Sequence, residues 1–496
     1  MKTALRITRD QNFADWYQEV IKEADLAEHS GVRGCMVLKP WGWAIWEHLQ
    51  ARLDAMIKAT GHRNCYFPIF IPVELLAKEA RHVEGFAKEM AVVTHHRLVQ
   101  KDGKLVPDAA LDQPLVVRPT SETIIGEAMA RWVGSYRDLP LLLNQWANVV
   151  RWEMRPRLFL RTSEFLWQEG HTAHADAEEA VTETRTMLGV YRTLVEDDMR
   201  IPVIMGEKTP GERFPGAVET HTIEAMMQDG RALQAGTSHF LGTNFAEAAG
   251  IRFQDRDGTE KLAWTTSWGV STRLIGALIM THSDDDGLRL PPRLAPAHVV
   301  IVPILRDEEG RQAVLEASEA LAARLRNRTA AGEALRVEID RRDDSPANKR
   351  WGWIKKGVPI VVELGPRDIA AGTVAFTRRD RIAEKRLGVA LDRFVEEAPA
   401  EIEAFGEVLW QEAVAYRRRQ TLGGIEDYEG LARHFGAEGA GGFVIGKWSG
   451  DPGIDARLAE LNMTVRCLPH EQSGTDGKCL VTGAPATLDA VYAKAY

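Results

Sequence analysis

The segment from residue 140 to residue 174 constrains the fold most, because it reads as two β-strands joined by a turn at residues 155–157. Residues of equal parity on a strand share one face of the sheet. That rule places Arg151 with Glu153 on the first strand. On the return strand it aligns Arg161, Ser163, Phe165, Trp167, Glu169 and His171. One face of the predicted antiparallel hairpin therefore combines arginines, carboxylates and large aromatic rings.

This face has two interpretations. A cross-strand pair of arginine and glutamate on a wet sheet face is common, and taken alone it is the simpler explanation. The alternative is a site for a planar, anionic ligand, because arginine forks bind phosphate or carboxylate oxygens and aromatic side chains enclose a ring. The hairpin alone leaves both open.

Two further segments place candidate residues at the starts of predicted helices. Residues 118–123 connect a strand to an apolar helix, and a Ser or Thr there predicts an N-cap worth about 1 kcal/mol. Glu122 also offers an acceptor to an ammonium ligand. Arg273 opens another apolar helix, where its charge opposes the helix dipole and requires either a neighbouring carboxylate or a bound phosphate.

Length and proline punctuation predict several domains. A chain of 496 residues exceeds what one hydrophobic core usually supports. Prolines at 291, 292 and 296 precede a new strand at 298–303, after which strands and helices alternate. A helix ending near Arg419 leads to a glycine-rich last segment. We expect boundaries that give units at 1–294, 295–400 and 401–496.

Several classes of protein are excluded by the sequence. The first residues lack the apolar stretch of a secretory signal, and no apolar run approaches the roughly 20 residues that span a bilayer, so we expect no membrane partner. Four cysteines without a Cys-x-x-Cys pair fit a reducing compartment, and we expect a cytoplasmic protein. A net charge of −9 argues against coating nucleic acid, but it leaves local contact open.

The phrases around these residues resemble prolyl-tRNA synthetases of the archaeal and eukaryotic type, which some bacteria also possess. Residues 67–72 and 78–86 resemble the first class II motif and its sequel, 118–123 the proline-recognition loop, 144–153 with 159–171 motif 2, and 269–273 motif 3. The resemblance runs from about residue 13 to Tyr496. It implies an α/β fold: an antiparallel β-sheet catalytic domain flanked by helices, an α/β anticodon-binding domain and a small α/β C-terminal domain.

The resemblance also implies the reaction and its residues. ATP with Mg²⁺ activates L-proline as prolyl-adenylate, and the terminal adenosine of tRNA(Pro) then accepts the prolyl group. The implied catalytic residues are Arg151 and Arg273. The implied proline site comprises Thr120, Glu122, Arg151, Trp167, Glu169, Phe214 and His239. The implied ATP site comprises Arg151, Glu153, Arg161, Phe165, Gln234, Thr237, Ser271 and Arg273.

A locally basic stretch of this acidic chain lies where the resemblance places the anticodon-binding domain. A solvated charged face is the alternative use of these residues. Proline codons are CCN, so the last two anticodon bases are guanines, which arginine reads through two hydrogen bonds. The resemblance favours anticodon contact by Arg341, Arg342, Lys355 and Arg367.

We expect no protein-bound metal. His171 and His174 suggest zinc, but a closed zinc site needs four ligands. Many relatives carry four zinc-binding cysteines in the last domain, and the corresponding positions here are Ser449, Ile454, Cys479 and Thr482. This domain is therefore expected to fold without structural zinc. The acidic triplet at 284–286 is more typical of a solvated loop than of a cation site.

The interval from Arg161 to Ser271 leaves no space for the large editing insertion of the bacterial prolyl type. A pocket discriminates small apolar groups by only about 1–3 kcal/mol, so we expect alanine and cysteine activation without correction in cis. A homodimer is expected because class II sites usually depend on one.

Two rival hypotheses are a non-catalytic synthetase paralogue and a threonyl-type synthetase. The retained arginines disfavour the first, and the loop at 120–122 disfavours the second.

Overall fold

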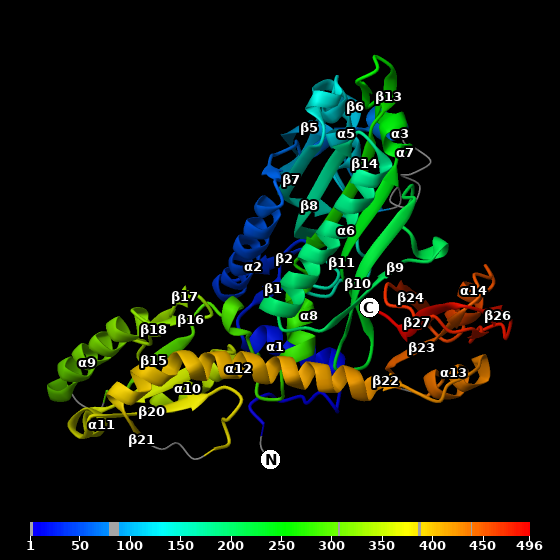
Figure 1. Cartoon of the computed structure of the whole chain (residues 1–496). Coiled ribbons are helices and arrows are strands. Elements are labelled where there is room, and N and C mark those ends of the chain that lie inside the picture. Colours follow the sequence, from blue (N-terminus) through cyan, green and yellow to red (C-terminus); the bar gives the residue numbers. More distant parts are fainter. Residues whose placement is uncertain (1–2, 79–88, 306–307, 385–387, 438) are drawn as a thin grey trace.

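The computed structural model describes residues 3–78, 89–305, 308–384, 388–437 and 439–496 (Figure 1). Its largest sheet has eleven strands in the order β22-β23-β27-β24-β9-β10-β11-β14-β8-β7-β3. The hairpin predicted at 140–174 is confirmed: β7 (Leu141–Val150) pairs antiparallel with β8 (Glu164–His174). The sheet continues through β14 (Trp264–Ser271), β11 (Ala232–Gly242), β10 (Glu219–Met226) and β9 (Val203–Glu207), all antiparallel.

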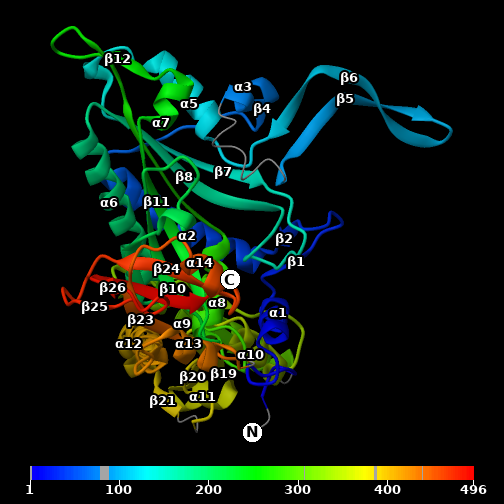
Figure 2. The ribbon, with the colours of Figure 1, turned by 90° about the vertical axis from the view of Figure 1, so that its right-hand side faces the viewer.

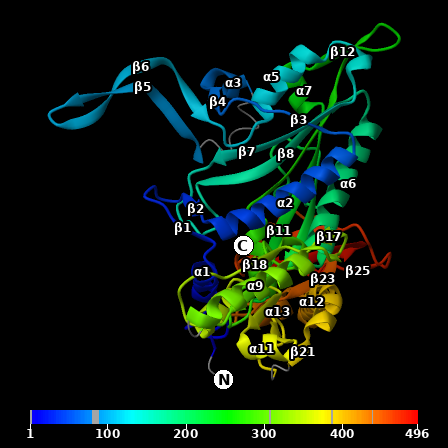
Figure 3. The same cartoon turned by 90° about the vertical axis from the view of Figure 1, so that its left-hand side faces the viewer.

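Helices cover one face of this sheet and leave the other for the site. On the covered face lie α2 (Pro40–Ala59) and α6 (Ala177–Thr193) (Figure 3). The buried ring of Trp268 packs there between Tyr191 and His62. Gly170 makes room for it, because a Cβ at that position would overlap the Trp268 ring. The N-terminal α1 (Phe13–Glu23) and α8 (Arg273–His282) extend the same hydrophobic core.

A two-stranded hairpin projects from the body of the protein (Figure 2). It consists of β5 (Ala91–Lys101) and β6 (Lys104–Val117), and β4 (Phe70–Pro72) completes the three-stranded sheet at its base. Helix α3 (Val73–Lys78) packs against β4 and β6 at this base, α5 (Glu122–Trp132) packs against α3, and α7 (Asn244–Ala249) packs against α5. Most of the predicted segment 78–86 lies outside the described residues.

The second unit has a five-stranded mixed sheet in the order β18-β15-β19-β20-β21. Its strands are β15 (Val299–Pro303), β18 (Val337–Ile339), β19 (Ile360–Leu364), β20 (Thr373–Arg378) and β21 (Gly388–Ala390). Its helices are α9 (Glu308–Arg326), α10 (Pro346–Lys355) and α11 (Pro366–Ala371). The long helix α12 (Leu391–Gln420) runs from this unit to the last one, so the expected boundary at 400 falls inside a helix (Figure 1).

The last unit extends the central sheet. It contributes β22 (Thr421–Leu422), β23 (Phe443–Trp448), β24 (Met463–Pro469) and β27 (Leu488–Lys494), with α13 (Tyr428–Phe435) and α14 (Ile454–Ala459). Strand β24 pairs antiparallel with β9 through Leu468 and Pro469. This continuity brings residues after 460 close to the face that carries the site.

The remaining strands are short. They are β1 (Ala27–His29), β2 (Met36–Leu38), β3 (Arg63–Asn64), β12 (Arg252–Gln254), β13 (Glu260–Leu262), β16 (Thr329–Ala330), β17 (Glu333–Ala334), β25 (Gly477–Lys478) and β26 (Pro485–Ala486). None of the helices in the described ranges combines the length and apolarity that a membrane span requires.

The acidic triplet at 284–286 is a correction to the sequence analysis. It is not a solvated loop, because Asp284 accepts hydrogen bonds from both terminal nitrogens of Arg379, a side chain that is itself buried. Asp285 pairs with Arg9. The triplet therefore ties the end of α8 to the second unit and to the N-terminal segment.

Candidate active site

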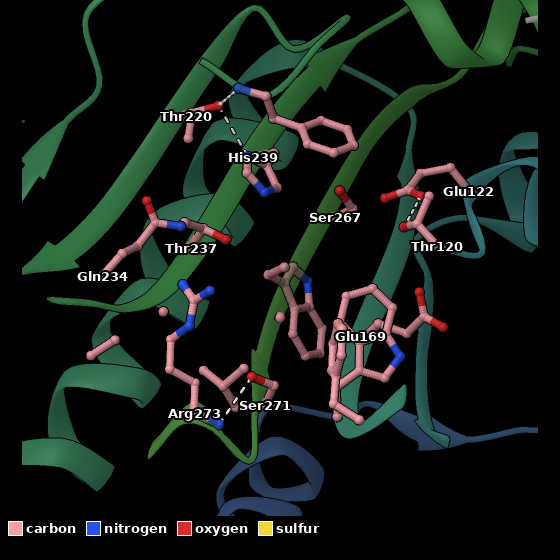
Figure 4. Close-up of a pocket in the computed structure, with 18 of the residues that line it drawn as sticks. Thr120, Glu122, Glu169, Thr220, Gln234, Thr237, His239, Ser267, Ser271 and Arg273 are labelled. Carbon is pink, nitrogen blue, oxygen red and sulfur yellow. Dashed lines mark hydrogen bonds between the residues drawn. The ribbon is translucent and has the colours of Figure 1, made fainter. Parts of the chain in front are cut away.

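A hollow of about 250 Å³ opens on the uncovered face of the central sheet (Figure 4). It is lined by every residue predicted for the proline site and by six of the eight predicted for the ATP site. The other two, Glu153 and Arg161, line a second hollow of about 330 Å³. The two hollows share Arg151, Phe165, Ser271 and Arg273. The predicted residues thus gather around two adjoining hollows.

The strand register explains why these residues meet. Ser267 lies opposite His171 on one neighbouring strand and opposite His239 on the other. Directly opposed residues of antiparallel strands point to the same face. The side chains on the predicted face of β8 therefore share one side of the sheet with those of β14 and β11 in register with them, and together they form the floor of the hollow.

A bulge in β11 aims Gln234 into the hollow. Thr237 pairs with Thr222, but Gln234 pairs with Glu224, so one extra residue is accommodated between them. Bulges of this kind re-aim side chains beside active sites. Without the bulge, Gln234 and Thr237 would have opposite parity and face opposite sides.

The loop at 118–123 uses its hydroxyl groups differently from the predicted helix cap. Ser121 stands at the N-cap position of α5, but its side chain caps no helix N–H group. It donates instead to Oε1 of Glu169 at 2.5 Å, and Thr120 donates to Glu122. The capping prediction is therefore wrong at this position, because the contact with Glu169 holds the Ser121 hydroxyl where its oxygen accepts from no N–H group of α5.

Glu169 and His171 form a buried hydrogen-bonded pair. The carboxylate accepts from Gln145 at 2.8 Å, and its other oxygen lies 3.0 Å from Nε2 of His171. Burial would raise the pKa of Glu169, but His171, Ser121 and Gln145 lower it. Burial would lower the pKa of His171, but Glu169 raises it. The pair places a fixed dipole in the floor of the hollow.

Arg151 stands at the junction of the two hollows. Strand β7 ends one residue earlier, so the prediction that placed Arg151 and Glu153 on this strand is wrong. Arg151 Nε donates to the carbonyl of Pro119 at 2.8 Å. Its guanidinium carbon lies 5.6 Å from the ring centroids of both Phe165 and Trp167. An anion that spans the two hollows would meet this charge.

Arg273 begins α8, as predicted. Figure 4 shows its guanidinium pointing toward Gln234 and Thr237. Burial, followed by the nearby charges of Arg161 and Arg151, lowers the pKa of Arg273 to about 10. Three arginines thus gather at one end of the site, and such a gathering is stabilised by an anionic ligand.

His239 and Phe214 form the opposite wall. Their rings lie 4.7 Å apart, and Nδ1 of His239 is 3.0 Å from Oγ1 of Thr220. Burial, followed by the charges of His221 and His171, lowers the pKa of His239 to about 3. His239 is therefore neutral at physiological pH, and this wall is aromatic and uncharged.

Ser267 was missed by the sequence analysis. It lines the hollow, and its Oγ is buried with no hydrogen-bond partner among the described residues; the same holds for Nε1 of Trp167. Unpaired buried polar atoms in a pocket are candidates for ligand contact. The alternation of Ser267, Gly269 and Ser271 along β14 was the signal that could have identified Ser267.

Three of the four positions considered for zinc in the last unit carry side chains that hydrogen-bond with one another. The hydroxyls of Ser449 and Thr482 lie 3.3 Å apart, and Ile454 is fully buried in the core of the last unit. Burial would raise the pKa of Cys479, but hydrogen bonds from Ser449 and Thr482 lower it. Across the described ranges, no cluster of His, Cys, Asp and Glu forms a metal site. Freedom from zinc stays a prediction.

His171 and His174 do not form a pair. They have opposite parity on β8, and Nε2 of His174 lies 2.8 Å from Oγ1 of Thr172. Their side chains therefore leave opposite faces of the strand.

Three of the four predicted anticodon residues have carboxylate partners. Arg341 pairs with Glu319, Arg342 Nε donates to Asp340 at 2.9 Å, and Lys355 Nζ reaches Glu23 of α1 at 2.5 Å. Arg367 is exposed in the first turn of α11. The four do not form one cluster of contacts, and Lys355 joins the second unit to the first.

Comparisons with known proteins identify the family of the chain. Residues 106–282 match the family described as tRNA synthetase class II core domain (G, H, P, S and T), and residues 298–401 match the anticodon binding domain. A proline--tRNA ligase from Protochlamydia amoebophila is 56% identical over 100% of this chain and 99% of its own length. One from Paramagnetospirillum magneticum is also 56% identical, with the same coverage. A crystal structure of prolyl-tRNA synthetase from Cryptosporidium parvum, complexed with halofuginone and AMPPNP, has a TM-score of 0.88 at 35% identity and covers 99% of both chains.

Proposed function

The chain belongs to the prolyl-tRNA synthetases, class II ligases that use ATP to join proline to its tRNA, and we propose that the two adjoining hollows hold the substrates of the first step. Proline lies in the hollow floored by Glu169 and walled by His239. ATP lies toward Arg273 and extends into the second hollow. The observation that carries this assignment is that Arg151 lines both hollows.

The proline end suits a protonated secondary amine, which has two N–H donors. The hydroxyl of Thr120 donates its proton to Glu122. The oxygen of Thr120 and the carboxylate of Glu122 are therefore the two acceptors for the N–H groups of the amine. The ring of proline packs among Trp167, Phe214 and His239. A neutral His239 fits this role, since a charged imidazole would repel the amine.

The ATP end suits a planar base attached to phosphates. Phe165 stacks on adenine, with Glu153 near its amino group, and Arg273 with Arg161 holds phosphate oxygens. Polar contacts to ATP come from Gln234, Thr237 and Ser271. The Cryptosporidium parvum enzyme was crystallised with AMPPNP, an ATP analogue, which supports an ATP site here.

Mg²⁺ accompanies ATP in this proposal. The ion needs few protein ligands, because it keeps waters and phosphate oxygens in its octahedron. The hollow also offers the carboxylate oxygens of Glu212 and the amide oxygen of Gln234 as protein ligands. Bound there, Mg²⁺ would neutralise charge on the departing diphosphate.

The chemical step is direct. The carboxylate of proline attacks the α-phosphate, the bond to the β-phosphate oxygen breaks, and diphosphate leaves with the electron pair. Negative charge grows on the phosphate oxygens, so the fixed guanidinium of Arg151 stabilises the transition state and aligns both reactants. The terminal adenosine hydroxyl of tRNA(Pro) then attacks the carbonyl carbon of the prolyl-adenylate anhydride, so that an ester to the tRNA forms, the bond from this carbon to the phosphate oxygen breaks, and AMP leaves.

The sequence type is a further part of the proposal. We assign the chain to the archaeal and eukaryotic-like type without an editing insertion, because α6 and the strands β9 to β11 occupy the interval between β8 and β14. Alanine and cysteine are then activated without correction. Hydrolysis of alanyl-tRNA(Pro) by this chain alone would contradict this assignment.

The second unit is proposed to read the guanines of the anticodon. The exposed Arg367 is the favoured reader. Arg341, Arg342 and Lys355 are weaker candidates, since Glu319, Asp340 and Glu23 already engage them. We further propose that the chain divides into units at residues 1–294, 295–400 and 401–496. We also propose that the enzyme is cytoplasmic.

A homodimer completes the proposal. The projecting hairpin exposes Leu98 and Leu105, which are 59% and 70% accessible. A two-stranded hairpin is marginally stable in water unless it packs on something. We propose that a second copy of the chain packs against this hairpin.

Exchange of labelled diphosphate into ATP tests the function. Proline should support exchange, and Arg151→Met should abolish it without unfolding the protein. Exchange with threonine in place of proline would indicate the threonyl alternative. No exchange with any amino acid would indicate a non-catalytic paralogue.

A further inference from the structure

A buried cluster of three charged side chains joins the last unit to the sheet beneath the site. Glu224 on β10 is fully buried. It accepts from Nζ of Lys208 at 2.9 Å and from Nε of Arg466 at 3.1 Å. Arg466 comes from β24 of the last unit, 242 residues later in the chain. Neither the predicted proline site nor the predicted ATP site includes any of these residues.

The cluster lies next to the ATP end of the hollow. Glu224 is the register partner of Gln234, and Thr222 is the partner of Thr237, so both face the same side as the site. Gln234 and Thr237 are the residues toward which Arg273 points (Figure 4). Among the charges acting on Arg273, Glu224 raises its pKa and Arg466 lowers it, while burial has the largest effect.

Both oxygens of Glu224 are fully engaged. Oε1 accepts from Lys208, from Thr222 at 3.1 Å and from Nη2 of Arg466 at 3.2 Å. Oε2 accepts twice from Arg466, at 3.1 Å each time. Burial would raise the pKa of Glu224, but Lys208 and Arg466 lower it, so the carboxylate stays ionised. The cluster carries two positive charges and one negative charge.

A buried carboxylate close to Arg273 would compete with phosphate for its guanidinium. Engaging both oxygens removes that competition. The excess positive charge lies in a low-dielectric region, where its effect on a nearby anion is stronger than in water. ATP is the anion that this arrangement suits.

We propose that Arg466 is a positioning residue for ATP: together with Lys208 it occupies both carboxylate oxygens of Glu224, and it supplies a positive charge from the last unit to the ATP site. The proposal rests on the proposed placement of ATP beside Arg273.

A series of charge variants tests it through the KM for ATP in proline-dependent diphosphate exchange. Arg466→Met removes the excess charge and is expected to raise this KM about tenfold, as the loss of one partly screened charge near an anion would. The KM for proline should change less than about twofold. Arg466→Lys keeps the charge and should stay near the wild-type value.

The double variant Arg466→Met/Glu224→Gln restores the net charge without restoring the ion pair. It should recover most of the affinity for ATP lost in Arg466→Met. A purely structural role predicts no recovery. Glu224→Gln alone should leave the KM for ATP unchanged or lower, so the test remains available if Arg466→Met fails to fold.

Arg457→Met is the matched control. Arg457 lies on α14 of the same unit, where its side chain donates to the carbonyl of Val481 at 2.6 Å and stacks on Tyr428. It should leave both KM values unchanged.

Two results would overturn the proposal: equal rises in the KM for ATP and for proline in Arg466→Met, or a double variant no better than the single one. Arg273→Lys separates this proposal from the proposed function. If it leaves the KM for ATP unchanged, the ATP placement fails. If it raises that KM while Arg466→Met does not, only the role of Arg466 fails.

Discussion

Replacing Glu122 by glutamine should damage recognition of proline far more than binding of ATP. The change keeps the shape of the side chain, and Thr120 can still donate to the amide oxygen, but the negative charge that meets the protonated amine is lost. A hydrogen bond to a charged group contributes about 1.5–3 kcal/mol. The kcat/KM for proline should therefore fall about 10- to 150-fold.

The assay is diphosphate exchange with proline and ATP varied in turn. Because the proposed contact of Glu122 is with the amine and not with the phosphates, the KM for ATP should change less than about twofold. Glu127→Gln is the matched control: it lies on the same helix, and its partner is the exposed Arg131 at 2.8 Å. An equal loss for both substrates, or a change below about threefold for proline, would refute the assignment of the amine to Glu122.

Three further predictions concern stability and metal content. Arg118→Met should lower the free energy of unfolding by about 3 kcal/mol or more, measured by urea denaturation, because it leaves buried acceptors at Phe67 and Asn148 unpaired; a loss below 1 kcal/mol would contradict this. In the pair of Glu169 and His171, the pKa of His171 is raised in the folded protein, so its contribution to stability is lost as the pH rises through that folded-state pKa. The pKa of Glu169 is lowered, so its contribution is lost as the pH falls through the folded-state pKa of Glu169. The difference in unfolding free energy between wild type and Glu169→Gln should thus be largest between about pH 4.3 and 6.5, the unfolded values, and a difference independent of pH would exclude this coupling. Elemental analysis should find no tightly bound zinc, and a chelator should not shift Tm; one zinc per chain would overturn the prediction made from Ser449 and Thr482.

The sequence predicted the side of the sheet that carries the site, because strand parity is a local property. Phe165, Trp167 and Glu169 alternate on β8, and the structure places all of them around one hollow. The same rule failed for Arg151 and Glu153, since the strand ends before them and loop geometry then sets their directions.

Features that depend on contacts between distant segments were not predictable. The use of Ser121 as a donor to Glu169 depends on β8 lying beside the loop, and propensity alone favoured a helix cap. The direction of the Gln234 side chain depends on a β-bulge that the sequence did not predict. Pairing of β24 with β9 joins residues more than 200 positions apart, and for this reason Arg466 was not recognised as a neighbour of the site.

A crystal structure of this chain with a non-hydrolysable prolyl-adenylate analogue would locate both substrates at once. We expect the proline ring among Trp167, Phe214 and His239, its amine within hydrogen-bond distance of Thr120 and Glu122, and the phosphate mimic at Arg151. Adenine should stack on Phe165. An analogue bound with its proline ring toward Arg273, or outside the two hollows, would contradict the proposed placement of proline and ATP.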